Sequence, residues 1–220
     1  MGIKEVYQRI RSEVPSSVTI VLAGKGRSLD EIKEAISAGC TDIGENYVQE
    51  AMMMYTLLGS EASKIKWHVI GHVQSNKINK ILPMTDCVQT IDSVSTADLF
   101  NKKAGLIGKN ISVLIEVNVG EEENKSGVMP DFSILKELCV AVSKKENLRL
   151  EGLMTMGPSV HNPEELRPYF KKVKELFDQI KSEGFNMDTL SMGMSNSYKI
   201  AIEEGSNMIR LGTIVFGQRH

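Results

Sequence analysis

Short apolar runs rich in Val, Ile and Leu alternate with longer amphipathic segments along the 220-residue chain. Runs of this length, bounded by Gly, Asn or Asp, are typical of buried strands. They predict eight strands, at residues 18–24, 41–44, 66–71, 86–90, 111–118, 149–154, 189–191 and 208–212. The segments between them predict helices, at residues 29–38, 47–58, 76–82, 96–104, 132–143, 163–183 and 197–204, and a further helix opens the chain.

This alternation predicts a parallel sheet, because each return to the same edge needs a crossover connection. Near-continuous apolar strands, such as residues 18–24, fit a sheet that is covered on both faces. Eight units predict a single (β/α)₈ barrel with an extra N-terminal helix, forming one domain over residues 1–220. An open doubly wound sheet is the alternative. Its first strand would need a Gly-rich dinucleotide turn, which Gly24-Lys25-Gly26 does not supply.

Composition and charge narrow the class of protein. A net charge of −2, with 41% hydrophobic and 25% charged residues, indicates no general attraction to nucleic acid or to a membrane. No apolar run is long enough for a secretory signal or a bilayer span, so a cytoplasmic location is expected. Cys40, Cys87 and Cys139 match no metal-binding spacing and no disulfide framework, and they are predicted to be reduced core residues.

Lys25 stands at the end of the first predicted strand. The C-terminal ends of the strands carry the chemistry in barrels of this kind. A lysine flanked by glycines at the end of an apolar strand can be partly desolvated, which leaves a nucleophilic amine for a carbonyl group. This segment alone favours a simpler alternative, a lysine whose ammonium group reaches water beyond the strand end.

The last two predicted strands end in small polar residues. The run from Ser191 to Ser195 leads a short strand into a helix, and it offers hydroxyls and free backbone N–H groups that favour a phosphate. The eighth strand continues into Gly212 and Thr213. Each stretch alone is typical of a plain turn. Together they predict a phosphate site, because barrels often build one from the loops after strands seven and eight.

Arg210 alternates with Ile209 and Leu211 in the eighth predicted strand. If those two residues pack on the helices, Arg210 points into the barrel. A guanidinium there needs hydrogen-bond or ionic partners. One interpretation is an ion pair with an interior carboxylate, either Glu45 or Glu116. The other is donation to a ring nitrogen of a ligand.

Motifs over nearly the whole chain resemble, in order, those of the pyridoxal-phosphate homeostasis proteins, whose fold is similar to the N-terminal barrel of alanine racemase. They are Gly-Glu-Asn-Tyr-Val-Gln-Glu at residues 44–50, Trp-His-Val-Ile-Gly at 67–71, Gln-Ser-Asn-Lys at 74–77, Gly-Leu-Met at 152–154, Leu-Ser-Met-Gly-Met-Ser at 190–195, Arg-Leu-Gly-Thr at 210–213 and Phe-Gly-Gln-Arg at 216–219. The first motif together with Ser-Met-Gly-Met-Ser is highly specific.

The resemblance implies that the cofactor is pyridoxal 5′-phosphate (PLP), held as an imine on Lys25. Asn46 would line the pocket beside the cofactor ring, and Arg210 would face the pyridine nitrogen. His68 and Met156 are weaker candidates for the pocket wall, and a satisfied interior histidine is an equal alternative for His68. The residues implied to hold the phosphate are Ser191, Ser195, Gly212 and Thr213.

Three positions depart from the family's pattern. Gly24 stands where a serine is usual before the lysine. Ser197 replaces a usual aspartate, and Asn207 replaces a usual threonine. None of the three removes an essential group, but Gly24 bears directly on the setting of Lys25.

A cationic Arg210 beside the pyridine nitrogen would disfavour protonation of the ring, and an unprotonated ring is a poorer electron sink. Racemisation also needs acid and base groups on both faces of the substrate. In the racemases that the barrel resembles, the opposite base comes from a second domain, whereas this chain ends at His220, directly after the barrel. The sequence therefore predicts a monomeric PLP carrier in intracellular PLP homeostasis, without substantial catalysis and with apo PLP-enzymes as candidate partners.

Two alternatives stay open. A PLP-dependent amino-acid racemase would use Lys25 on one face of the substrate and an unidentified pocket residue on the other. A cofactor-free Schiff-base aldolase would use Lys25 to attack a sugar phosphate directly. A yellow purified protein would separate the cofactor-binding classes from the aldolase.

Overall fold

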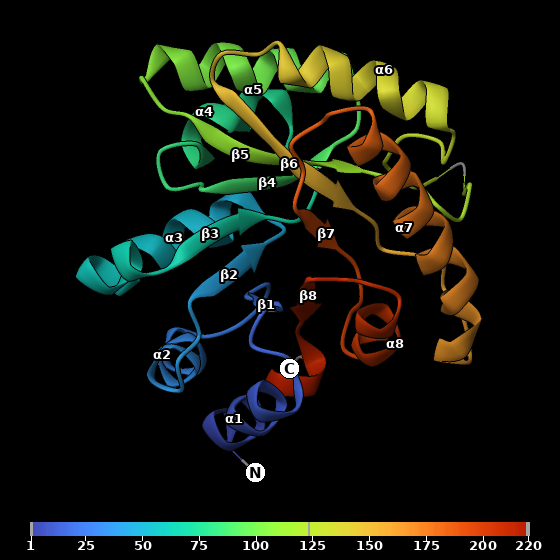
Figure 1. The fold of residues 1–220 in the computed structure, drawn as a ribbon. Helices are drawn as coiled ribbons and strands as arrows, with labels where there is room; N and C mark the ends of the chain where they lie inside the picture. The colour runs from blue at the N-terminus through green and yellow to red at the C-terminus, as the bar shows by residue number, and fades with distance from the viewer. Residues whose placement is uncertain (1, 123, 219–220) are drawn as a thin grey trace.

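The computed structural model describes residues 2–122 and 124–218. Within them, eight parallel strands form a closed barrel in sequence order, because β8 pairs back onto β1. The helices lie around the outside of this barrel (Figure 1). The predicted (β/α)₈ barrel with an extra N-terminal helix is confirmed, and the open doubly wound sheet is excluded.

The strands and helices lie close to their predicted bounds. The short α9 was not predicted, because four residues carry no periodicity to detect. The strands are β1 (Thr19–Ala23), β2 (Asp42–Glu45), β3 (Lys66–Val69), β4 (Cys87–Ile91), β5 (Ile111–Glu116), β6 (Leu148–Met154), β7 (Thr189–Ser191) and β8 (Met208–Leu211). The α-helices are α1 (Ile3–Glu13), α2 (Leu29–Ser37), α3 (Val48–Leu58), α4 (Ile78–Ile81), α5 (Val94–Leu106), α6 (Phe132–Ser143), α7 (Arg167–Ser182), α8 (Tyr198–Glu203) and α9 (Thr213–Phe216). Three short 3₁₀ helices of the described residues are η1 (Gly59–Lys64), η2 (Ser75–Lys77) and η3 (Pro163–Leu166).

Apolar side chains pack in two places, because successive strand residues point to opposite faces of the sheet. Ile209 and Leu211 belong to the large cluster that joins the strands to the helices. Leu114 and Met154 belong to a small separate cluster inside the barrel. Arg210 points inward, as its alternation predicts, since its guanidinium bonds to groups of β7 and the end of β6.

The three cysteines are buried free thiols, as expected of core residues. Burial raises the pKa of the Cys40 and Cys139 thiols to about 12, so both stay protonated and weakly reactive near neutral pH. The part of the chain that the structure describes contains no His, Cys, Asp and Glu cluster suited to a metal ion. It also contains no helix with the length and apolar character needed to cross a bilayer.

Candidate functional site

A cavity of about 470 Å³ lies at the C-terminal ends of the barrel strands. This volume is within the range of small-ligand sites. The lining contains six of the seven residues predicted to bind a cofactor, together with the weaker candidate Met156: Lys25, Asn46, Ser195, Arg210, Gly212, Thr213 and Met156. Ala23, Ile70, Met194 and Asn196 complete it. Fold closure therefore brings together residues that lie up to about 190 positions apart in sequence.

The loop that carries Lys25 is held by backbone hydrogen bonds on both sides. The Gly24 N–H donates to the Gly44 carbonyl at 2.9 Å, and the Gly26 N–H donates to Glu50 Oε2 at 2.9 Å. Lys25 is half-buried, with its Nζ 5.0 Å from the centroid of the Tyr47 ring. This cation–π contact and the two loop anchors fix the amine at the rim of the barrel.

Arg27 ties the same loop to the end of the chain. Its buried guanidinium donates to the carbonyls of Phe216 and Gly217, at 3.2 and 2.6 Å. The lysine loop is thereby joined to α9, whose first residue lines the cavity. The sequence did not identify Arg27, because no local pattern distinguishes it from a surface arginine.

The loops after β7 and β8 meet through Ser195. Its Oγ accepts hydrogen bonds from the Gly212 and Ile214 N–H groups, at 3.1 and 3.3 Å. The hydrogen bonds of the described residues do not engage the N–H groups of Ser195, Asn196 or Thr213. These N–H groups and the exposed Thr213 hydroxyl are suitable donors for an anion. The adjoining helices α8 and α9 have only six and four residues, so these donors matter more than a helix dipole.

Gly193 gives the β7 loop its shape. Its φ of +95° lies in the left-handed region, and a Cβ there would come within 2.5 Å of Ala201 Cβ. Ser197 closes the same turn, since its Oγ accepts the Met194 N–H at 3.1 Å. Serine thus supplies the bond that an aspartate could supply at this position.

The other two departures have distinct settings. Asn207 precedes β8, where its side chain accepts the Leu190 N–H and donates to the Asp188 carbonyl, away from the cavity lining. Gly24 provides space beside the lysine loop, because a Cβ on it would lie 2.3 Å from Glu45 Oε1. Arg219, in the last motif of the chain, lies outside the described residues.

Glu45 is a buried carboxyl at the end of β2. It is 3% exposed, and its Oε2 has no hydrogen-bond partner among residues 2–122 and 124–218. Burial, with a smaller repulsion from Glu50, raises the pKa of Glu45 to about 8. Glu45 is therefore mostly protonated at neutral pH.

Arg210 closes the floor of the cavity. Its Nη1 donates to the Ser191 carbonyl and hydroxyl, at 3.0 and 2.5 Å, and its Nη2 donates to the Thr155 carbonyl at 2.7 Å. In the described structure no ion pair joins it to Glu45 or Glu116, so carbonyls and a hydroxyl are its partners. Burial lowers its pKa to about 10 against an opposing effect of Glu116, and the group stays cationic at neutral pH.

Ser191 and His68 lie below the cavity and do not line it. Ser191 is completely buried, and its hydroxyl donates to Gln89 Oε1 at 2.7 Å. His68 is hydrogen-bonded to Asp42 and Gln89, which agrees with a satisfied interior histidine. Ser191 was predicted to contact a phosphate, but the structure directs its side chain to the barrel interior, where it contacts Arg210.

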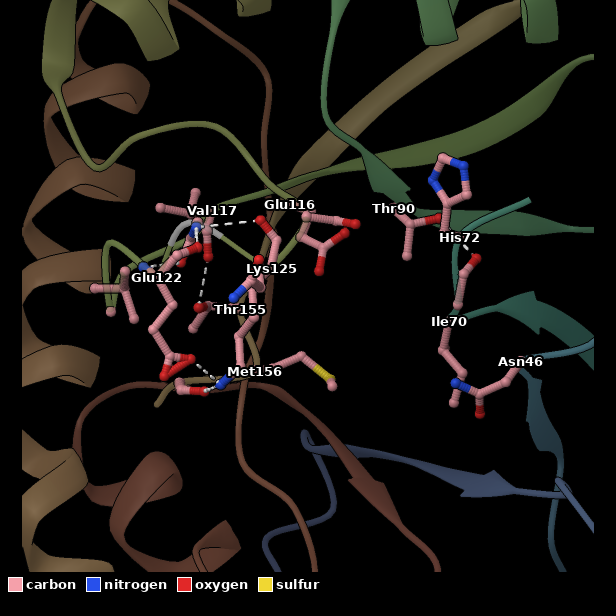
Figure 2. A pocket seen from close by; sticks show the side chains of 17 residues that line it. Asn46, Ile70, His72, Thr90, Glu116, Val117, Glu122, Lys125, Thr155 and Met156 are labelled. Carbon is pink, nitrogen blue, oxygen red and sulfur yellow. Dashed lines mark hydrogen bonds and ion pairs between the residues drawn. The ribbon is translucent and has the colours of Figure 1, made fainter. Parts of the chain in front are cut away.

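A second cavity, of about 280 Å³, shares Asn46, Ile70 and Met156 with the first. Figure 2 shows its two walls, with Thr90 on one side and Glu116 reaching inward from the other. Burial raises the pKa of Glu116 to about 7, while Arg210 lowers it and Asp92 adds a smaller increase. The second cavity therefore holds a carboxyl group that changes charge near neutral pH.

Comparisons with known proteins match almost the whole chain. The family model described as alanine racemase, N-terminal domain, matches residues 3–220. The pyridoxal phosphate homeostasis protein of Aquifex aeolicus is 40% identical over 189 residues, which cover 86% of this chain and 81% of that protein. The pyridoxal phosphate homeostasis protein of Haemophilus influenzae is 36% identical over 207 residues, which cover 93% and 86%.

Solved structures give the same relationship. PipY of Synechococcus elongatus PCC7942, solved with PLP bound, has a TM-score of 0.89 at 28% identity, and the match covers 98% of this chain and 100% of PipY. Alanine racemase of Clostridium difficile 630 shares the fold, with a TM-score of 0.85 at 15% identity over 56% of its own length. The chain belongs to the alanine racemase N-terminal domain family, and within it to the group of pyridoxal phosphate homeostasis proteins.

Proposed function

We propose that this protein binds PLP through a covalent bond between Lys25 Nζ and the aldehyde carbon, and that it carries PLP in cofactor homeostasis without substantial catalysis. The main observation behind this proposal is the 470 Å³ cavity, which brings the Lys25 amine together with anion donors and a buried guanidinium. PLP supplies an aldehyde that condenses with an amine, with loss of water. The names of the relatives and the PLP bound in PipY support this function.

The donors in the cavity fit the two polar ends of the cofactor. The phosphate would be bound by the N–H groups of Ser195, Asn196 and Thr213 and by the Thr213 hydroxyl. Gly212 has no side chain, so the phosphate can approach the backbone there. The hydrogen bonds that Arg210 makes within the described residues engage three of its five N–H groups, which leaves donors for a ring nitrogen. Asn46 would lie beside the ring. Ser191 would act through Arg210.

The proposal of a carrier rests on the acid–base groups in the same cavity. Among the described residues that line it, Lys25 is the one general acid or base, since the others are amides, hydroxyls, thioethers, apolar groups and an arginine. Racemisation needs two acid–base groups, on opposite faces of the substrate. Arg210 at the ring nitrogen would also weaken the ring as an electron sink. Apo PLP-enzymes are the proposed recipients, and the proposed carrier is a cytoplasmic monomer.

A PLP-dependent racemase is the second candidate, and Glu116 is the observation that favours it. Its pKa of about 7 suits a general acid or base, and it lines the cavity that adjoins the first. Incubation with L- and D-amino acids in deuterated water separates the two functions. A carrier gives at most slow α-proton exchange without inversion. Turnover in the range of about 1–10³ s⁻¹, lost in Lys25→Ala, would establish the racemase.

Titration of the purified protein with PLP tests the proposal. Visible absorbance of the lysine-bound cofactor should rise and saturate at one PLP per chain. A later addition of an apo PLP-enzyme should then remove the cofactor and restore the activity of that enzyme. An absence of saturable absorbance would refute PLP binding through a lysine. Saturation without transfer would refute the carrier role alone.

A further inference from the structure

Five buried side chains from five strands form a continuous hydrogen-bonded chain across the barrel interior, below the cavity. Arg210 of β8 donates to Ser191 of β7 at 2.5 Å, and Ser191 donates to Gln89 Oε1 of β4 at 2.7 Å. Gln89 Nε2 lies 3.0 Å from His68 Nδ1 of β3, and His68 Nε2 lies 2.9 Å from Asp42 Oδ1 of β2. All five residues are 6% exposed or less, so water does not compete for these bonds.

The two ends of this chain fix the direction of every bond. A guanidinium only donates, whereas a carboxylate only accepts. The Ser191 oxygen therefore accepts from Arg210, and its hydrogen goes to Gln89 Oε1. The amide nitrogen of Gln89 then faces an unprotonated His68 Nδ1, and the hydrogen of His68 is on Nε2, which donates to Asp42. Every donor points from Arg210 toward Asp42.

Met208 gives independent support for this orientation of the amide. Its sulfur lies 3.3 Å from Gln89 Nε2, and a thioether accepts a hydrogen bond but cannot donate one. The amide group beside both Met208 and His68 must therefore be the NH₂ group. A flipped Gln89 would place its oxygen against the sulfur and would leave Ser191 with two donors and no acceptor.

The carboxylate end is itself anchored. Asp42 Oδ2 accepts the Thr41 hydroxyl at 2.7 Å. Although burial alone would raise it, the pKa of Asp42 is lowered by its bonds from His68 and Thr41. The negative charge of Asp42 polarises the hydrogen-bonded chain in the direction that stabilises a cationic Arg210. Burial of Arg210 has the opposite effect, since it disfavours the charged guanidinium.

We propose that Gln89, together with His68 and Asp42, is a positioning unit that holds Arg210 against the cofactor ring through Ser191. This proposal rests on the proposed PLP function. The unit fixes Nη1 on the interior side, which leaves Nε and the second N–H of Nη2 as the donors for the cofactor ring. Gln89 is the critical member, because its Oε1 accepts from Ser191 while its Nε2 donates to His68.

Two substitutions of Gln89 distinguish positioning from packing. Gln89→Leu fills the space but removes the acceptor from Ser191, so Arg210 loses a fixed partner. Gln89→Glu keeps the acceptor, and a protonated His68 can donate to the new carboxylate. Ser112→Ala is the matched control. Its hydroxyl is also buried in a strand, but it bonds to Glu151 and Arg149 and not to the chain.

The first arm of the experiment uses protein without cofactor. Long-range ¹H–¹⁵N spectra report the protonation of each histidine ring, and His68→Asn identifies the signal of His68. At pH 7 we expect neutral His68 with its hydrogen on Nε2 in the natural protein and in Ser112→Ala, and a doubly protonated ring in Gln89→Glu. A hydrogen on Nδ1 in the natural protein would overturn the proposed direction of the chain.

The second arm measures PLP binding and the absorbance spectrum of the bound cofactor. Gln89→Leu should weaken binding roughly tenfold and shift the absorbance maximum, since one charge-assisted bond loses its support. Gln89→Glu should bind within about threefold of the natural protein, as should Ser112→Ala. Unchanged affinity and spectrum in Gln89→Leu would overturn the positioning role while the PLP function stood. If the natural protein binds no PLP, the proposed function fails and the positioning role fails with it, although the first arm still decides the bond directions.

Discussion

The buried polar groups below the cavity and the carboxyl groups beside it differ in how fully they are paired. Below it, Gln89 and Ser191 are completely buried, and their side-chain atoms bond to neighbours on other strands. Beside the cavity, Glu45 keeps an unpaired Oε2 within the described part of the chain, and Glu116, which lines the adjoining cavity, has a pKa of about 7.

This difference separates residues that hold the site in place from residues that meet the ligand. A buried polar group without a partner costs free energy, so such groups are uncommon in folded proteins. The unpaired Glu45 lies beside the lysine loop, which indicates that this cost is retained next to the place where a ligand is received. Substitutions of these two carboxyl groups should therefore change binding or pH dependence, whereas substitutions in the hydrogen-bonded chain below the cavity should change binding through the geometry of Arg210.

Lys25→Ala should have the largest effect on binding. Loss of the amine removes covalent attachment, so the protein should retain no coloured cofactor after dialysis. Its half-buried position predicts a change in the free energy of unfolding within about 0.5 kcal/mol. Absorbance after dialysis and thermal melting check both expectations. Lys77→Ala is the control and should retain the cofactor; colour that survives in Lys25→Ala would contradict the assignment.

Glu45→Gln should change the pH dependence of stability. The folded pKa of about 8 is above the ordinary value of 4.5, so folding favours the protonated form. Its contribution is fully present below about pH 4.5 and is lost as the pH rises through 8. The Gln89 amide is neutral at every pH and adds no pH dependence to stability. Glu45→Gln should likewise remove the pH dependence that Glu45 causes. The variant should gain on the order of 3 kcal/mol over the natural protein between pH 5 and pH 8.

Urea unfolding of cofactor-free protein at several pH values measures this gain. Glu116→Gln should show the same sign with a smaller size, because the pKa of Glu116 is raised only to about 7. A stability difference that stays constant between pH 5 and pH 8 would mean that Glu45 is ionised in the folded protein.

Ser195→Ala with Thr213→Val should weaken PLP binding about 10- to 100-fold. Thr213→Val removes a hydroxyl donor worth about 0.5–1.5 kcal/mol, and more toward a charged phosphate, and Ser195→Ala removes the Oγ that holds the Gly212 and Ile214 N–H groups. The fold should stay intact, because Ser195 lies in a loop and the exposed Thr213 is the first residue of the four-residue helix α9. The dissociation constant and the melting temperature give the two readouts. Thr213→Ser, which keeps the hydroxyl, should bind like the natural protein. An unchanged constant in the double variant would place the phosphate elsewhere.

Gly24→Ala should have the smallest effect. The new Cβ would lie 2.3 Å from Glu45 Oε1, but a carboxyl group at the end of a flexible side chain can move. We expect a loss of about 1 kcal/mol in the free energy of unfolding. Adding Glu45→Ala should remove the dependence on residue 24, which a double-mutant cycle measures. Independent effects of the two substitutions would show that they do not contact each other.

The sequence was sufficient to predict the barrel, because strand and helix periodicities recur eight times and each connection is long enough for a crossover. It also indicated Lys25, after one predicted strand, and Arg210, within another, as candidates that the family resemblance strengthened, and both line the cavity. The depth of Ser191 was not accessible, since residues 191 and 195 share one motif while the turn at Gly193 sends them to different levels.

The hydrogen-bonded chain from Arg210 to Asp42 was also not predicted, and the reason is different. Gln89 carries a signal, a polar side chain within the buried strand β4. Its partner His68 lies on the neighbouring strand β3, but Ser191 and Met208 come from β7 and β8, across the barrel. Barrel closure decides that these inward residues meet. Asp42 and Arg27 were missed because their partners His68 and Gly217 lie 26 and 190 positions away in the sequence.

The central claim is that PLP is held on Lys25, and chemical trapping tests it most directly. The protein is loaded with PLP, reduced with borohydride to make any lysine linkage permanent, digested, and mapped by mass spectrometry. We expect one modified peptide, with the label on Lys25. A label on another lysine, such as Lys77 or Lys125, or the absence of any label after saturation with PLP, would contradict it.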